Sequence, residues 1–226
     1  MTTDDGCEDD SQPLFDGRAG TLRDGTESGP LFDDAYQPGE SGAAAGLVGG
    51  RDDDPVLVAG VGYPLLGDLA LGTVVAYRVL EWNLPGVAVA DCSHTPIAAY
   101  QTIDEGAYET VILVGTEKRG GELNDGEPSA NPGTVREYDP AEFAVSDDDL
   151  VARIGECAMG SNTVENVVVI ANAFDALPDE TRIITVEPGY DSWGTTVEEF
   201  TAPVEEALED VLERVLESVE GALAEA

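Results

Sequence analysis

Side chains that can bind a metal ion or move a proton follow three apolar runs of the chain: Asp68, Asp91, Cys92, His94 and Glu117. Cys92 and His94 are two residues apart, and His94 is the only histidine of the sequence. In a loop, this spacing lets the thiol and the imidazole face one ligand, or lets the imidazole activate the thiol as a nucleophile. Together with Asp68 and Glu117 they also form a chemically sound metal-binding set. The residue types therefore predict a metal site or a Cys–His hydrolytic pair.

A purely structural interpretation is the one we favour for Cys92 and His94, and it is equally open for Asp68. Cys92 would pack as a small apolar side chain, and His94 would be solvated at the tip of a loop. Asp68 would cap the helix that follows it. Spacing alone does not choose between the two interpretations, because a site also requires the side chains to converge in space.

The elements that position these residues are indicated by the alternation of apolar runs and helical periodicity. Continuous apolar runs predict strands buried on both faces of a parallel sheet. An edge strand is expected after a polar loop over 120–132. The alternation predicts an α/β fold, a three-layer sandwich with an open, mostly parallel sheet of the phosphorylase/hydrolase-like kind. In such sheets sites form at the carboxyl ends of the strands. We expect strands over 56–61, 86–90, 110–114, 133–138 and 182–186, and helices over 69–80, 96–105, 162–173 and from Thr201 onward.

Four short motifs, in a fixed order on these elements, resemble a known family. They are Gly60-Val61-Gly62-Tyr63-Pro64-Leu65-Leu66-Gly67-Asp68, Asp91-Cys92-Ser93-His94, Pro132-Gly133-Thr134-Val135 with Asp139-Pro140, and Val186-Glu187-Pro188-Gly189 with Trp193-Gly194. The chain resembles the hydrogenase maturation proteases, nickel-dependent endopeptidases that remove a C-terminal extension from the large subunit of [NiFe] hydrogenases. The resemblance covers roughly residues 56 to 217.

The resemblance implies a nickel-sensing triad of two carboxylates and a histidine, and this chain departs from it. The positions that correspond to the triad hold Leu69, Gly115 and Ser161, or Asn162 beside it. Tyr63 replaces an asparagine that the family usually has. Leucine and glycine offer no side-chain donor to nickel, which the family uses as its recognition element. Without ligands there is no metal to polarise a peptide carbonyl, so we predict no catalytic and no metal-binding residue at these positions.

Three hypotheses for the function follow. The first is a pseudoenzyme of this peptidase family, which binds a protein or peptide, such as a metalloenzyme subunit, without cleaving it. The second is an active peptidase or other hydrolase with a relocated metal or Cys–His site around Cys92, His94 and Glu117. The third is an acidic scaffold that uses its N-terminal tail, where Pro-Leu-Phe-Asp occurs twice, at 13–16 and 30–33.

Composition limits the environment and the partners. The 226 residues carry 47 acidic and only 10 basic side chains, a formal charge of −37. Repulsion on this scale opposes folding in dilute salt, whereas at molar salt the Debye length falls to about 3 Å. The acidity predicts a halophilic host and argues against nucleic acid as a partner. No signal-peptide pattern and no apolar segment of about 20 residues is found, which favours a cytoplasmic protein without a membrane contact.

The distribution of residue types along the chain predicts two regions. Residues 1–54 are rich in glycine, acidic residues, serine and proline, and we expect a disordered acidic tail and linker. Residues 55–226 contain the apolar runs and the family motifs, and we expect them to form the α/β domain. The three cysteines form no CxxC pair, so neither a disulfide framework nor a zinc ribbon is predicted.

Overall fold

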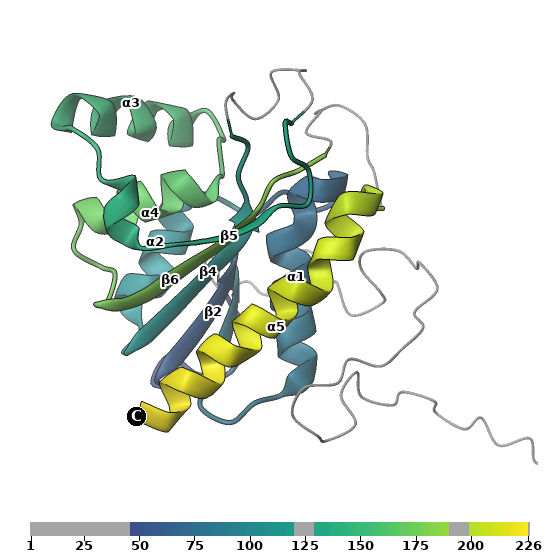
Figure 1. The fold of residues 1–226 in the computed structure, drawn as a ribbon. Coiled ribbons are helices and arrows are strands. Elements are labelled where there is room, and N and C mark those ends of the chain that lie inside the picture. Colours follow the sequence, from purple (N-terminus) through teal and green to yellow (C-terminus); the bar gives the residue numbers. More distant parts are fainter. Residues whose placement is uncertain (1–45, 120–128, 190–198, 226) are drawn as a thin grey trace, which may run out of the picture.

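The computed structural model describes residues 46–119, 129–189 and 199–225. Within them the chain forms six strands, which alternate with helices as the sequence predicted (Figure 1). The strands are β1 (Leu47–Gly49), β2 (Val56–Gly60), β3 (Val87–Asp91), β4 (Thr110–Thr116), β5 (Val135–Tyr138) and β6 (Glu180–Val186). The helices are α1 (Leu71–Trp82), α2 (Pro96–Glu105), α3 (Asp147–Ala158), α4 (Val164–Ala173) and α5 (Ala202–Glu225), with 3₁₀ turns η1 (Gly67–Ala70) and η2 (Pro140–Phe143).

The sheet is open and mostly parallel, in the order β1-β3-β2-β4-β6-β5. The four inner strands run parallel, and β1 and β5 close the two edges in antiparallel pairing. Every residue of β2, β3 and β4 is buried, as expected of strands that helices cover on both faces. The predicted fold class is therefore confirmed, and so is the edge strand near residues 133–138.

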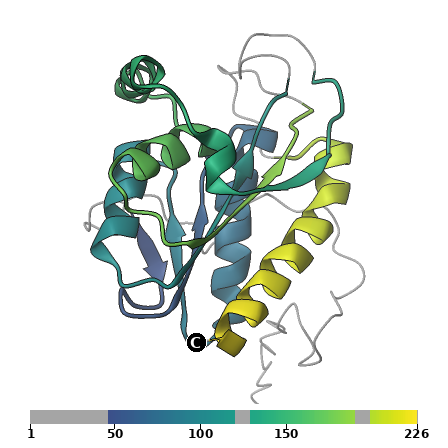
Figure 2. The same ribbon diagram turned by 60° about the vertical axis from the view of Figure 1, so that its left-hand side comes forward.

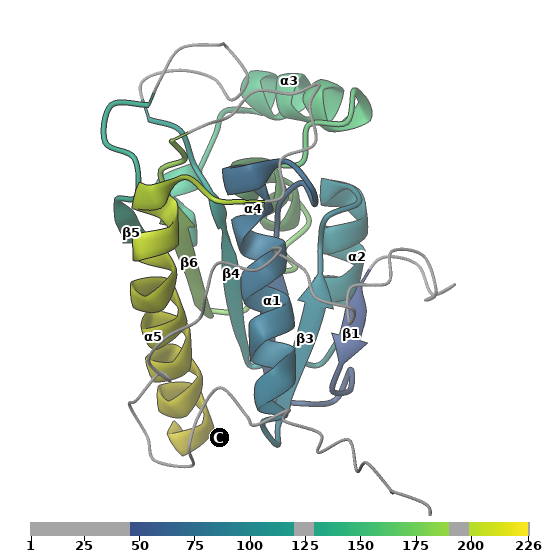
Figure 3. The ribbon, with the colours of Figure 1, turned by 90° about the vertical axis from the view of Figure 1, so that its right-hand side faces the viewer.

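Helices cover both faces of the sheet and make a three-layer sandwich. Figure 2 shows α5 on one side of the sheet and α2 and α4 on the other, and Figure 3 shows α1 beside α5. One hydrophobic core lies under α1 and α5 and contains Leu71, Ile112 and Val211. The second lies under α2 and α4 and contains Leu57 and Val168. The apolar face of α5 is buried in the first core, with Leu208 buried only partly: Val204, Leu208, Val211, Leu212, Val215 and Val219.

The glycine-rich turn after β2 exists because two backbones approach each other closely. A Cβ atom on Gly60 would lie 2.1 Å from the carbonyl oxygen of Gly72, and one on Gly72 would lie 2.2 Å from that of Val61. Only residues without a side chain permit this approach. The start of α1 is thereby pressed against the end of β2, which fixes the direction of the loop between them.

Three elements were missed in the sequence. β1 pairs with β3 and lies within the range 1–54 that was predicted to be tail and linker. Its three residues between glycines carry no strand signal. α3 was missed because only Cys157 of its residues is buried, and η2 is a single turn. Residues 1–45 with both Pro-Leu-Phe-Asp copies, the loop 120–128 and Trp193 lie outside the described residues.

No helix in the described ranges is long and apolar enough to cross a membrane.

Candidate functional site

Two loops and one helix connection meet at the carboxyl end of the sheet. The chain leaves β2 toward α1 on one face and, after β4 and β5, reaches α4 on the other face. The gap between β2 and β4 is thus the topological switch point, where ligands bind in open α/β sheets. The loops 61–66 and 92–95 and the α3–α4 connection 159–163 converge here. We call this region the mouth.

Tyr63 and Asn162 tie the mouth together. The Asn162 side chain is buried, and its Nδ2 donates to the carbonyl oxygens of Cys92 at 2.8 Å and Gly62 at 3.3 Å. The Asn162 backbone N–H donates to the Tyr63 hydroxyl, which itself donates to the carbonyl oxygen of Gly160 at 3.3 Å. Burial raises the pKa of Tyr63, so the hydroxyl keeps its proton for this donation. The residue that replaces the expected asparagine therefore joins the first loop to the 159–163 connection.

The three positions that the resemblance assigns to metal ligands do not fit a nickel ion. Leu69 is fully buried in the body of the protein. A Cβ atom at Gly115 would lie 2.3 Å from Val164 Cγ2 and 2.7 Å from the Val61 carbonyl oxygen, so protein atoms occupy that space. Ser161 Oγ accepts a hydrogen bond from Asn166 Nδ2 at 3.2 Å. Two of the three positions are thus apolar and packed, and the third offers only a hydroxyl.

Asp68 has a role that the sequence did not predict. Its buried carboxylate does not cap η1 or α1. It accepts hydrogen bonds from the Gly189 backbone N–H at 2.8 Å and from Thr201 twice, from the backbone N–H at 2.7 Å and the hydroxyl at 2.8 Å. The predicted helix cap is therefore wrong. Asp68 instead connects η1 to the residue that precedes α5.

The residues of the hypothesised relocated site around Cys92 and His94 differ in burial. Cys92 is buried, whereas His94 is exposed. Burial, and next to it the charge of Asp91, raises the pKa of the Cys92 thiol to about 12. Glu117 accepts a hydrogen bond from the Thr185 hydroxyl at 3.1 Å. No group of three or more His, Cys, Asp or Glu side chains in the described part of the chain is placed to hold a metal ion.

The structural interpretation of this loop is the one that fits the geometry. Cys92 packs in the core under α2 and α4. Asp91 is buried and holds its own loop, because it accepts hydrogen bonds from the Ser93 backbone N–H at 3.0 Å and from the Tyr77 hydroxyl at 3.4 Å. The acidic residue nearest the thiol thus orders the turn after β3.

Cys92 is expected to resist alkylation. With a pKa of about 12, roughly one thiol in ten thousand is ionised at pH 8, because each pH unit below the pKa lowers the thiolate tenfold. Iodoacetamide modification, followed by peptide mass spectrometry at pH 8, should be slower at Cys92 than in the same chain unfolded in urea by about a thousandfold or more. Equal rates in the folded and unfolded chains would contradict the burial of this thiol.

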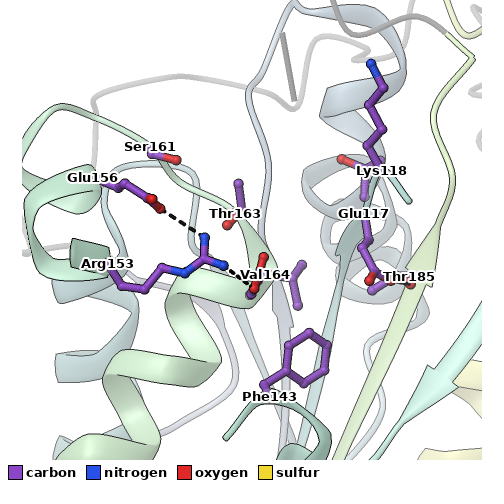
Figure 4. A pocket seen from close by; sticks show the side chains of 11 residues that line it. Glu117, Lys118, Phe143, Arg153, Glu156, Ser161, Thr163, Val164 and Thr185 are labelled. Atoms are coloured by element: carbon purple, nitrogen blue, oxygen red, sulfur yellow. Dashed lines mark hydrogen bonds and ion pairs between the residues drawn. The ribbon is translucent and has the colours of Figure 1, made fainter. Parts of the chain in front are cut away.

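A cavity of about 390 Å³ lies beside the mouth, between α3, α4 and the ends of β4 and β6. Figure 4 shows Arg153 beside Glu156 on one wall, and Glu117 and Lys118 on the opposite wall. Arg153 also forms an ion pair with Glu165 of α4. Phe143 and Val164 supply apolar surface. The complete lining is Thr116, Glu117, Lys118, Phe143, Arg153, Glu156, Ser161, Thr163, Val164, Glu165 and Thr185. The walls offer both charges and several hydroxyls to a polar, extended ligand.

Sequence reasoning missed Arg153 because it missed α3. A signal was present: Ser146 accepts a hydrogen bond from the Asp149 backbone N–H as the N-cap, and three aspartates follow in the first turn. This pattern predicts the start of a helix even where the apolar periodicity is weak.

Two of the four motifs that carried the resemblance, 132–135 and 186–189, meet around a second buried carboxylate, Glu187. Its backbone pairs with Gly133 at 2.8 Å and Thr134 at 3.0 Å. Its carboxylate accepts from the Asn131 backbone N–H at 3.1 Å and lies 3.5 Å from the Arg136 guanidinium. These motifs therefore fasten β5 to β6 beside the start of α5, and their role here is structural.

The same arrangement is found in solved structures. The [NiFe] hydrogenase maturation protease HycI from Thermococcus kodakarensis KOD1 matches with a TM-score of 0.51 and 20% identity, over 74% of this chain and 93% of that chain. The hydrogenase maturating endopeptidase HybD from E. coli matches with a TM-score of 0.51 and 18% identity, over the same shares. A hydrogenase 3 maturation protease matches with a TM-score of 0.51 and 20% identity, over 73% of this chain and 90% of that chain. The chain has the fold of the hydrogenase maturation proteases.

The likeness to the hydrogenase maturation proteases confirms at the level of the fold what the motifs predicted. No family model and no curated protein matches the sequence. In this chain the maturation-protease fold carries Leu69, Gly115 and Ser161 at the three positions where the resemblance places metal ligands.

Proposed function

We propose that this protein is a non-catalytic relative of the hydrogenase maturation proteases that binds a protein or peptide partner at the carboxyl end of its sheet. The observation that carries the proposal is the packing at the three former ligand positions. Leu69 is buried, the space beside Gly115 is filled by Val164, and Ser161 accepts a hydrogen bond from Asn166. The loops at the carboxyl end of the sheet can still form a binding surface, whereas the residues at the ligand positions do not support metal-dependent peptide hydrolysis.

Hydrolysis of a peptide requires a nucleophile or a metal-bound water, and the residues at the mouth supply neither. Burial raises the pKa of the Cys92 thiol to about 12, so the thiol is protonated at neutral pH. Ser161 Oγ is hydrogen-bonded to an amide, which is not a base. The active-hydrolase hypothesis is therefore not favoured by any described contact.

The partner class follows from the neighbours and from the cavity. The solved structures with this fold are described as proteases of hydrogenase maturation, whose substrates are proteins. The cavity between α3 and β4 has apolar surface at Phe143 and charged walls at Arg153 and Lys118. An extended segment of a metalloenzyme subunit, with side chains of both kinds, suits such a groove.

The environment is proposed to be a cytoplasm at high salt. On α5 the residues Glu205, Glu209, Glu213 and Glu217 are all exposed and four residues apart. Like charges at this spacing repel one another on a helix, and molar salt screens most of that repulsion. The α5 surface supports the interpretation of the charge of −37 as an adaptation to the solvent.

The first test is a titration of nickel and zinc into the purified protein in molar KCl, followed by calorimetry. We expect no saturable binding, and the same result for His94→Ala, because the described residues form no ligand cluster. Saturable binding that His94→Ala abolishes would demonstrate a rebuilt metal site and overturn the non-catalytic proposal.

The second arm of the test uses metalloenzyme large subunits from the same cell, with binding and cleavage followed together. We expect binding without cleavage, and weaker binding by Arg153→Glu, which reverses the charge of one cavity wall. Arg78→Glu, on α1 away from the cavity, is the matched control and should bind like the parent. A shortened subunit would demonstrate peptidase activity and contradict the non-catalytic proposal. Equal binding by Arg153→Glu and Arg78→Glu would show that the partner does not contact this cavity wall.

A further inference from the structure

A second cavity shares a wall with the cavity of the proposed function. It has a volume of about 530 Å³ and is formed by η2 and the residues after it, by the first turns of α3 and by the C-terminal half of α4. We call the cavity with charged walls the first cavity and this one the second cavity. The walls of the second cavity are mainly apolar and include Phe143, Val145, Leu150, Val169 and Ala173.

Both cavities are built from the same elements. Phe143 lines the first cavity and the second, and Figure 4 shows its ring at the lower edge of the first. α3 contributes Arg153 to the first cavity and Leu150 to the second, and α4 contributes Val164 to the first and Val169 to the second. The second cavity therefore continues the first one past the Phe143 ring, along two helices that pack on each other.

The distance between the two cavities can be estimated from α4. Val164 lines the first cavity, and Val169 and Ala173, which line the second, follow it by five and nine residues. A rise of about 1.5 Å per helical residue places them about 7 to 14 Å further along the helix. An extended chain advances about 3.3 Å per residue, so roughly two to four residues of a bound segment connect the cavities.

The side chains at the second cavity favour an aliphatic residue with a basic neighbour. Val145 is 38% exposed and Ile154 is 44% exposed. Ile154 lies on the same side of α3 as Leu150, because it follows Leu150 by four residues. Such partly exposed aliphatic side chains gain free energy when a further apolar side chain covers them. Asp147 lines the same cavity, and its carboxylate can accept charge-assisted hydrogen bonds from a lysine or an arginine.

We propose that the partner segment in the first cavity extends past Phe143 and places an aliphatic side chain in the second cavity. The segment is extended, with a polar or charged residue in the first cavity and the aliphatic residue two to four positions away. A basic residue beside the aliphatic one faces Asp147. The inference rests on the proposed function for the class of occupant, a protein segment, and adds the sequence pattern by which this segment is recognised. The buried aliphatic side chain is the anchor that distinguishes it from other polar segments.

The test selects from a random library of short synthetic peptides, acetylated and amidated at their ends, on the immobilised full chain in molar KCl. We expect the enriched peptides to carry an aliphatic residue two to four positions from a polar one. The affinity of one enriched peptide is then measured by fluorescence anisotropy. Ala173→Trp, which fills the second cavity, and Ala141→Glu, which places a charge in it, should each weaken binding about tenfold, as the loss of one anchor does. Both alanines are exposed at the cavity, so neither change removes a core contact.

The matched control is Ala152→Trp. Ala152 is exposed on α3 and lines neither cavity, so this variant should bind the peptide like the parent. Binding weakened equally by Ala152→Trp and Ala173→Trp would overturn the assignment to the second cavity. Enriched peptides without an aliphatic anchor would also overturn the proposal.

Arg153→Glu separates this inference from the proposed function. Binding that Arg153→Glu weakens and the two second-cavity variants leave unchanged would overturn the inference while the first cavity stands. Binding that only the second-cavity variants weaken would overturn the shared segment. If no peptide is enriched, the inference fails, whereas the proposed function is judged by the metalloenzyme subunits. A dimer of the parent in sedimentation experiments that Ala173→Trp abolishes would assign the second cavity to another copy of this chain and overturn the proposal.

Discussion

Replacement of Asp68 with alanine is expected to lower the free energy of unfolding by about 3 kcal/mol, because a buried carboxylate that accepts charge-assisted hydrogen bonds leaves its donors unsatisfied when it is removed. The donors are the backbone N–H groups of Gly189 and Thr201 and the Thr201 hydroxyl. Thr201 directly precedes α5, whose apolar face is a large part of one core. Urea unfolding in molar KCl, followed by circular dichroism, measures the loss.

Two variants make the Asp68 result specific. Asp68→Asn keeps an acceptor oxygen and should lose less than the alanine variant. Asp179→Ala removes an exposed aspartate and should stay within about 0.5 kcal/mol of the parent, as surface substitutions usually do. If Asp68→Ala and Asp179→Ala were equally stable, the carboxylate would not hold the start of α5.

Gly115→Ala is expected to destabilise the protein by about 3 kcal/mol, the upper range for overpacking a core. The new Cβ atom would lie 2.3 Å from Val164 Cγ2 and 2.7 Å from the backbone oxygen of Val61. The Val61 carbonyl oxygen belongs to the backbone, so it can move away from the new Cβ atom only if the end of β2 shifts. The thermal midpoint in molar KCl should fall accordingly. A carboxylate at this position, as the resemblance would require, needs still more room.

The chain offers a close control for Gly115. A Cβ atom at Gly155, within α3, would meet nothing within 4 Å, so Gly155→Ala should be neutral or stabilising by up to about 1 kcal/mol. The double variant Gly115→Ala/Val164→Ala should recover only part of the loss, because the contact with the Val61 oxygen remains. Full recovery would show that Val164 alone fills the former ligand space.

The strands could be predicted from the sequence because their burial is complete. All residues of β2 and β4 are buried, and their apolar side chains alternate between the two cores, which produces the continuous apolar runs 56–59 and 111–114. α3 gave no such signal, since Cys157 is the only fully buried residue of the helix. β1 depends on pairing with β3 and not on its own residues.

The site was predictable only where a residue type decides the chemistry. The absence of donors at Leu69 and Gly115 follows from the letters alone. The role of Asp68 does not, because its partners Gly189 and Thr201 are 121 and 133 residues away. The state of Cys92 does not either, because the two-residue spacing to His94 is the same whether the thiol is buried or exposed. The burial of Cys92 argues against its use as a nucleophile.

The cavity has one wall that is less firmly held than the others. α3 forms that wall, and among its residues only Cys157 is buried, with an ion pair from Arg153 to Glu165 on α4. Local unfolding of such a helix requires much less free energy than global unfolding. We therefore expect amide hydrogens of α3 to exchange with solvent through sub-global opening while the sheet stays intact. A ligand that contacts Arg153 must supply the free energy that orders α3 against the rest of the cavity. The local stability of α3 is therefore a determinant of binding affinity.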